Sequence, residues 1–141
     1  LHVGRQLVPF LLVHPGGIAT NIGVHFFDML IWIFGDVKES NVTQHTDVTA
    51  SGKLQLEKAT VNWMLSIDVE TLPASVKTTG KRTYRTLTIN KQAIEFSDGF
   101  TELHTKSYEE ILNGNGFRIS ETIKAIELVH NIRNSKVYTK Q

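Results

Sequence analysis

The 141-residue sequence contains no cysteine, which excludes a disulfide framework, a thiolate metal site and a cysteine nucleophile. It also has no internal repeat, no low-complexity segment and only three prolines. Its longest hydrophobic run, from Val24 to Phe34, is interrupted by His25 and Asp28 and is too short to span a bilayer. These absences favour a cytoplasmic protein without a membrane partner.

An excess of charge of one sign is missing as well. Fifteen Lys and Arg residues face fourteen Asp and Glu residues, which gives a net charge of +1. The two signs are interspersed and no basic stripe is present, so the composition gives no support for a nucleic-acid partner. No pair of histidines and carboxylates has convincing metal-ligand spacing, and we expect no metal site. The hydrophobic share of 40% is typical of a soluble globular domain with a buried core.

The order of the patterns predicts an α+β fold. Pro15-Gly16-Gly17 breaks the chain, and a long helix is expected from Ile18 to Phe34, with Thr20 or Asn21 near its start and Gly35 at its end. Period-two alternation then predicts strands between Asp36 and Ser97, and Asn90-Lys91-Gln92 is a plausible tight turn between the last two. Two helices follow, from Thr101 to Leu112 and after an N-cap at Ser120.

Consecutive strands without intervening helices predict an open, mainly antiparallel, meander-like sheet. The long N-terminal helix and the C-terminal helices are expected to pack on one face of this sheet. The other face would then need cover, and we expect a homo-oligomer to form through it.

The densest cluster of chemically active side chains lies on the long predicted helix. Asn21 and His25 are four residues apart and Asp28 follows three residues later, so all three share one face. A histidine can exchange a proton near neutral pH, and an amide beside it can hold a hydroxyl group. Asp28 could orient the imidazole. The alternative from spacing alone is a buried histidine whose hydrogen bonds Asp28 satisfies.

The segment from Gly16 to Leu30, GGIATNIGVHFFDML, together with Trp32 and Phe34-Gly35, resembles a superfamily signature. It is similar to the second domain of the glucose–fructose oxidoreductase and inositol dehydrogenase (Gfo/Idh/MocA) superfamily. Within it, the chain resembles the UDP-N-acetylglucosaminuronate 3-dehydrogenases of lipopolysaccharide O-antigen biosynthesis. Three further segments carry the subgroup resemblance: Gly80–Arg85, Phe96–Thr105 and Ser107–Leu112.

The resemblance implies a two-domain enzyme that oxidises a UDP-linked N-acetylamino uronic acid at its C3 hydroxyl with NAD. His25 matches the active-site histidine that takes part in proton transfer, and Asn21 matches a position that contacts sugar hydroxyls. In such enzymes an N-terminal Rossmann domain binds NAD. No G-x-G-x-x-G follows a strand in this sequence, so we expect the cofactor site to lie outside this chain and the chain alone to be inactive.

Four other residues are candidates for substrate binding. Arg82 and Arg85 belong to a basic cluster that suits a diphosphate, although a solvated turn or a subunit contact explains them as well. His104 and Thr105 lie near a helix start whose free N–H groups suit sugar oxygens or an anion, and capping and ordinary packing are the alternative.

Residues 16–141 are predicted to form the substrate-binding and oligomerisation domain. Residues 1–15 do not look like the family's usual approach to Gly16, and the chain begins at Leu1 instead of methionine. We therefore expect a divergent strand, a truncation or a cloning scar there. The alternative function is a non-catalytic sugar-binding or assembly domain derived from the same family.

Overall fold

The computed structural model describes residues 2–3, 17–81, 83–89, 91–97, 102–135 and 137. Its elements are, in chain order, β1 (His2–Val3), η1 (Ala19–Gly23), α1 (Val24–Phe34), β2 (Val37–His45), β3 (Thr49–Leu56), β4 (Thr60–Ser66), η2 (Val69–Thr71), α2 (Ala74–Lys77), β5 (Thr86–Ile89), β6 (Gln92–Glu95), α3 (Leu103–Leu112) and α4 (Ile119–Asn134). The predicted α+β class is confirmed. No helix in these described ranges is long and apolar enough to cross a membrane.

The predicted long helix is present, and it begins with a π-helical stretch. η1 runs directly into α1, which ends where Gly35 takes a φ of 83° and its N–H donates to the Ile31 carbonyl oxygen over 2.9 Å. The expected stop at Gly35 is therefore confirmed. Thr20 and Asn21 do not cap the helix, because both lie inside η1 and no side chain caps its start.

The strands form one six-stranded sheet in the order β2-β3-β4-β1-β5-β6. β2, β3 and β4 make the expected antiparallel meander, and β5 pairs with β6, with Ile89 opposite Gln92. Asn90 of the predicted turn lies outside the described residues. The prediction of a simple meander is wrong at the centre of the sheet. β1 lies there between β4 and β5, parallel to β4 and antiparallel to β5, so part of the segment that we judged atypical belongs to the sheet.

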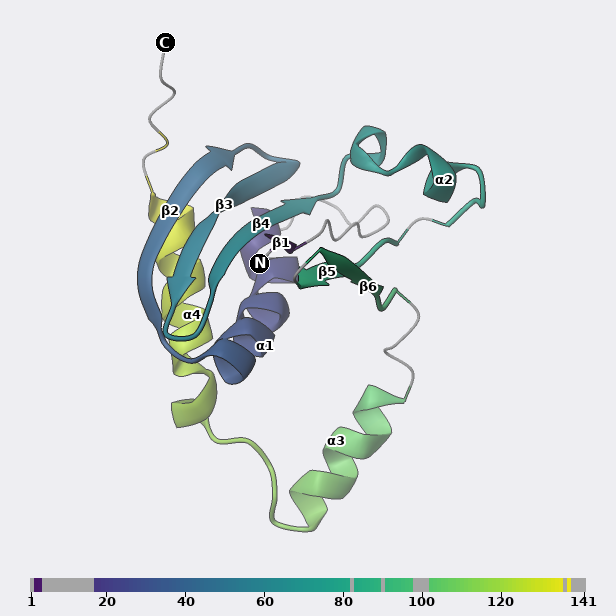
Figure 1. Ribbon diagram of the computed structural model, residues 1–141. Helices are drawn as coiled ribbons and strands as arrows, with labels where there is room; N and C mark the ends of the chain where they lie inside the picture. Colours follow the sequence, from purple (N-terminus) through teal and green to yellow (C-terminus); the bar gives the residue numbers. More distant parts are fainter. Residues whose placement is uncertain are drawn as a thin grey trace.

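Two helices, α1 and α4, cover one face of β2–β4 (Figure 1). The core between these layers includes fully buried Phe27 and Leu30 from α1, Ile132 from α4, and Leu54 and Leu65 from the sheet. Phe27 meets the indole ring of Trp63 edge-on, with ring centroids 5.1 Å apart.

The opposite face of β2–β4 carries no helix in the described part of the chain (Figure 1). Its side chains are mostly polar, with Asn41 opposite Lys53, Lys53 opposite Asn62, and a hydrogen bond between the Thr43 and Ser51 hydroxyls; half-buried Met64, opposite Ser51, is apolar. An antiparallel sheet with one apolar and one polar face is stable with the polar face in water.

The two C-terminal helices behave differently. α4 contributes the buried residues Ala125, Leu128, Val129 and Ile132 and packs along α1. α3 lies away from the sheet (Figure 1), and its described side chains from Thr105 to Leu112 are exposed. The start of α4 was placed wrongly at Ser120. The N-cap is Arg118, whose backbone N–H donates to the Glu121 carboxylate over 2.6 Å.

Candidate functional site

The helix formed by η1 and α1 presents two different faces. Its inner face buries Ile22, Phe26, Phe27 and Leu30. Gly23 lets this face approach the sheet closely, because a Cβ atom there would lie 2.9 Å from Leu65 Cδ1 and 2.8 Å from Phe27 Cε2. Helix and sheet are thus fixed relative to each other at the turn that carries the candidate residues.

The outer face of the same helix carries the three predicted residues of the cluster. Asn21 and His25 are exposed and Asp28 is half-buried. Trp32 continues the row at the helical spacing of one further turn, and 83% of its surface is exposed. The structure therefore brings Asn21, His25 and Asp28 together on one accessible face, with a large aromatic side chain at its end.

The alternative of a buried histidine satisfied by Asp28 is wrong. His25 is exposed, and among the hydrogen bonds and ion pairs of the described residues none joins it to Asp28. An accessible imidazole with free ring nitrogens can meet a substrate hydroxyl, whereas a buried and satisfied one cannot. The orienting role of Asp28 stays a prediction.

The π-helical stretch η1 places Asn21 in a widened turn of the backbone. Such turns are rare and are found frequently at functional sites. Within it, the Thr20 hydroxyl oxygen is buried and has no hydrogen-bond partner in the structure. Neither feature was expected, because periodicity does not separate a π turn from an α turn over five residues. The exposed position of Trp32 could have been found from its seven-residue spacing to His25.

Arg85 lies before β5 and is hydrogen-bonded to Ser97, which follows β6. Its backbone N–H donates to Ser97 Oγ over 3.0 Å and its Nη1 donates to the Ser97 carbonyl oxygen over 3.5 Å. Burial lowers the pKa of the Arg85 guanidinium. These contacts favour a structural role for Arg85, and its substrate role stays a prediction. Arg82 lies outside the described residues.

The candidates on α3 are not joined to this helix. Thr105 is exposed, and the His104 side chain lies outside what the structure describes. Among the described elements α3 has no extensive contact with α1. The structure thus groups Asn21, His25 and Asp28 and leaves Thr105 apart.

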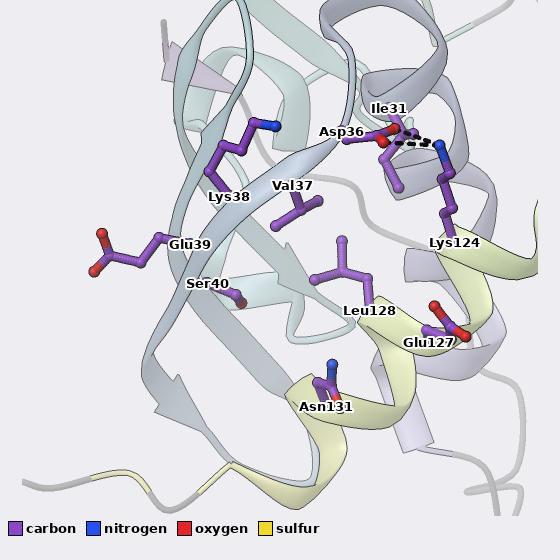
Figure 2. A pocket seen from close by; sticks show the side chains of 10 residues that line it. All are labelled: Ile31, Asp36, Val37, Lys38, Glu39, Ser40, Lys124, Glu127, Leu128 and Asn131. Carbon is purple, nitrogen blue, oxygen red and sulfur yellow. Dashed lines mark hydrogen bonds and ion pairs between the residues drawn. The ribbon is translucent and has the colours of Figure 1, made fainter.

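A cleft of about 440 Å³ lies elsewhere, between α4 and the edge strand β2 (Figure 2). Lys124 Nζ closes one end of it by donating to both carboxylate oxygens of Asp36, over 2.6 and 2.8 Å. The hydrogen bond from Lys124 lowers the pKa of Asp36. None of the predicted site residues lines this cleft. The ion pair of Lys124 with Asp36 links α4 to the junction of α1 and β2.

No group of three or more His, Asp or Glu side chains in the described ranges is arranged to hold a metal ion. The chemistry available on the outer helix face is therefore that of an imidazole, an amide and a carboxylate. This set can bind a hydroxyl group and accept its proton.

Comparison with known proteins gives a consistent result. Residues 13–62 match the family model for the C-terminal α/β domain of an oxidoreductase family. Two solved structures of the WlbA (WbpB) dehydrogenase from Thermus thermophilus are 35% identical to the chain and superpose with a TM-score of 0.90 over 99% of it. One of these structures contains NAD and α-ketoglutarate, the other NAD and UDP-GlcNAcA.

The chain spans 48% of the length of the Thermus protein. A protein from Bacteroides fragilis superposes over 94% of the chain and 52% of its own length, at 12% identity and a TM-score of 0.51. YPO2259 from Yersinia pestis superposes over 92% and 53%, at 15% identity and a TM-score of 0.52. These two likenesses concern the fold alone.

Proposed function

Since the chain belongs to this oxidoreductase family and carries its C-terminal α/β domain, we propose that it is the substrate side of an NAD-dependent dehydrogenase. The substrate class is a UDP-linked N-acetylamino uronic acid, oxidised at a secondary alcohol in surface-polysaccharide biosynthesis. Two observations support this proposal: the Thermus relative is solved with NAD and UDP-GlcNAcA, and the outer face of the η1–α1 helix presents Asn21 and His25 to solvent.

The chemistry assigned to each residue follows from its side chain. Oxidation of a secondary alcohol removes a hydride from carbon and a proton from the hydroxyl group, and NAD supplies the hydride acceptor. In this proposal the His25 imidazole accepts the hydroxyl proton and the Asn21 amide holds the sugar hydroxyl. Asp28, half-buried one turn further on, limits where the imidazole can move.

The sequence contains no G-x-G-x-x-G, the glycine-rich turn that holds the cofactor's pyrophosphate in a Rossmann domain. We therefore assign NAD binding to a separate domain that lies against the outer face of α1. Trp32, exposed at the end of this face, is the side chain best suited to anchor such a domain, since large aromatic residues dominate domain and protein interfaces.

The experiment is a chimera in which this chain replaces the C-terminal half of the Thermus WlbA dehydrogenase. NADH formation is measured with UDP-GlcNAcA as the substrate. We expect turnover, and we expect His25→Ala to reduce it by about a hundredfold or more, the usual contribution of a general acid or base. Ser75→Ala, exposed on α2, is the control and should leave the rate unchanged.

A chimera that binds NAD but gives no NADH contradicts the dehydrogenase proposal. If the chain then still binds UDP-GlcNAcA, with amide shifts at Asn21 and His25 in an NMR titration, the alternative of a non-catalytic sugar-binding domain holds. Turnover of a polyol without UDP would keep the reaction and change the substrate class.

The homo-oligomer through the open sheet face also remains a proposal. That face is mostly polar, with Asn41, Lys53 and Asn62 across its centre and Met64 beside them. We therefore expect any contact there to be hydrated and to depend on hydrogen bonds. Arg82, His104 and Thr105 keep their predicted substrate roles as hypotheses for the same chimera.

A further inference from the structure

Two asparagine–glycine pairs follow each other in the connection between α3 and α4. They are Asn113-Gly114 and Asn115-Gly116, and both asparagine side chains are exposed. In the part of the chain that the structure describes, neither side-chain amide takes part in a hydrogen bond. The sequence alone gives the two pairs the same chemistry, so any difference between them comes from the fold.

An asparagine that precedes glycine can react with its own backbone. The nucleophile is the amide nitrogen of the glycine, and the target is the carbonyl carbon of the asparagine side chain. Glycine favours this reaction because it has no Cβ atom in the way and its backbone moves freely. In a folded protein the reaction also requires that the side chain can turn and that no hydrogen bond holds the glycine N–H.

The fold protects the first pair. Asn113 is the C-cap of α3, with φ −81° and ψ 1°, and its N–H donates to the Glu109 carbonyl oxygen over 3.0 Å. The Gly114 N–H, which would supply the nucleophile, donates to the Ile111 carbonyl oxygen over 3.1 Å. A reaction at Asn113 must therefore first break a hydrogen bond that ends the helix.

The second pair lacks this protection. The Asn115 N–H donates to the Glu110 carbonyl oxygen over 2.8 Å, which holds the residue at the end of the helix. The Gly116 N–H, in contrast, has no acceptor among the described residues, and the chain has no regular secondary structure from Asn115 to Arg118. Asn115 thus combines an exposed side chain with a free backbone nitrogen in the next residue.

Asn134 before Ser135 is a further asparagine with a small residue after it, and both of its reacting groups are engaged. Asn134 Nδ2 donates to the His130 carbonyl oxygen over 2.8 Å, and the Ser135 N–H donates to the Ile132 carbonyl oxygen over 3.2 Å. Among the described asparagines that precede a small residue, Asn115 is therefore the one that meets both requirements.

We propose that Asn115 is a site of spontaneous modification, at which the side-chain amide is converted to a carboxylate. In the first step the Gly116 nitrogen attacks Asn115 Cγ. A bond forms between these two atoms, the bond from Cγ to Nδ2 breaks, and Nδ2 leaves as ammonia with the proton that the Gly116 nitrogen gives up. The product is a cyclic imide, a succinimide.

In the second step water opens the succinimide ring. Cleavage at Cγ gives aspartate, whereas cleavage at the main-chain carbonyl carbon gives isoaspartate, in which the chain continues through the former side chain. Water is the only co-reactant, and nothing is oxidised or reduced. The proposal concerns the chain itself and does not depend on the proposed dehydrogenase function.

The modification changes both the charge and the path of the chain beside α3. One new carboxylate lowers the formal net charge from +1 to zero, and it lies at the C-terminal end of the helix, where a negative charge is unfavourable. Gly116 lies against Ile111, since a Cβ atom there would be 3.0 Å from Ile111 Cγ1. The longer backbone of isoaspartate would displace this contact.

Peptide mapping tests the site. The full chain is incubated at mildly alkaline pH and physiological temperature, and mass spectrometry follows the loss of each side-chain amide. Trypsin releases both pairs in one peptide, Ser107–Arg118, whose fragment ions separate the two positions. Asn115 should react about fivefold faster than Asn113, since a hydrogen bond of ordinary strength at the Gly114 N–H changes a rate by about that factor.

The unfolded chain is the matched control. In concentrated urea the hydrogen bonds of the fold are lost, and the two pairs should then react at about equal rates. Equal rates in the folded chain, or a faster reaction at Asn113, overturn the proposal.

Two variants give a second, independent measurement. Asn115→Gln lengthens the side chain and disfavours ring closure, so an aged sample should show little acidic species on native isoelectric focusing and little labelling by an isoaspartyl methyltransferase. Asn113→Gln is the control and should keep both signals at the level of the parent chain. Signals that survive Asn115→Gln and disappear in Asn113→Gln would place the modification at the wrong pair and overturn the proposal.

Discussion

Gly52 lies at the centre of β3, where the sheet has no room for a side chain. It pairs with Val42 on β2 and with Trp63 on β4. A Cβ atom at this position would overlap the Asn41 carbonyl oxygen and lie 2.9 Å from Cζ2 and 3.0 Å from Cε2 of Trp63. Trp63 cannot turn aside easily, because its ring is held edge-on against Phe27.

Gly52→Ala should therefore destabilise the fold by about 2 kcal/mol. Overpacking a close-packed core costs about 1–3 kcal/mol. Replacing glycine by alanine reduces the freedom of the unfolded chain, which returns about 0.4–1 kcal/mol. Because the overlap involves a backbone oxygen as well as a ring, we place the cost at the upper end of its range.

Urea unfolding measures this loss. In a Trp32→Phe background the fluorescence of buried Trp63 follows the unfolding of the core, and a loss of 2 kcal/mol lowers the midpoint by about 1 M. Lys53→Ala, the next residue but on the exposed face, is the control and should change stability by less than about 0.5 kcal/mol. Trp63→Phe combined with Gly52→Ala, both followed by far-UV circular dichroism because no buried tryptophan remains, should cost less than the sum of the two single changes.

The argument is refuted if Gly52→Ala leaves the midpoint unchanged or raises it. That result would mean that β2 or the indole ring moves aside without cost, and the core would be looser than these distances imply.

Two further predictions concern the docking and the start of α4. Lys124→Met should lower the free energy of unfolding slightly above pH 5, and this effect should shrink as the pH falls below the ordinary range of an aspartate carboxyl, because the lowered pKa of Asp36 stabilises the fold only while its carboxyl is ionised; urea midpoints from neutral to acidic pH measure the difference. Glu121→Ala should cost about 1 kcal/mol at neutral pH, because its carboxylate accepts the first free backbone N–H of α4; thermal unfolding measures this loss.

Each of these predictions has its own control. Lys77→Met removes an ion pair with Glu70 far from α4 and should show no effect on the docking of that helix, while a Lys124→Met difference that does not shrink at acidic pH would contradict the Asp36 pair. Glu127→Ala removes a carboxylate from the middle of α4, and a loss equal to that of Glu121→Ala would assign the effect to charge instead of to the cap.

The long helix was predictable because several signals agree at each of its ends. Pro15-Gly16-Gly17 breaks the chain before it, the apolar spacing of Ile22 and Phe26 continues through it, and Gly35 can take the positive φ that ends it. The strands followed equally from alternation. The same helix also defines the face that holds Asn21, His25 and Asp28, so this part of the candidate site could be placed from spacing alone.

Other features depend on contacts that spacing does not encode. Ser120 looked like an N-cap, but the carboxylate of Glu121 reaches the Arg118 N–H and starts the helix earlier. The exposure of His25 depends on which face of the helix meets the sheet. The exposure of α3 could not be predicted, since the helical spacing of its apolar residues Tyr108, Ile111 and Leu112 is typical of a helix packed on a core.

The two-residue strand β1 has a consequence for how the sheet holds together. In the described sheet, the hairpin of β5 and β6 is connected to β2–β4 through His2 and Val3 alone, by pairing with Asn62 on one side and with Leu87 and Thr88 on the other. The sheet therefore consists of two cooperative units that are joined only by β1, a short strand from a distant part of the chain. Loss of the pairing of β1 would let the amide protons of β5 exchange with solvent while those of β3 stay protected. His2 and Val3 therefore determine whether the sheet unfolds as one unit or as two.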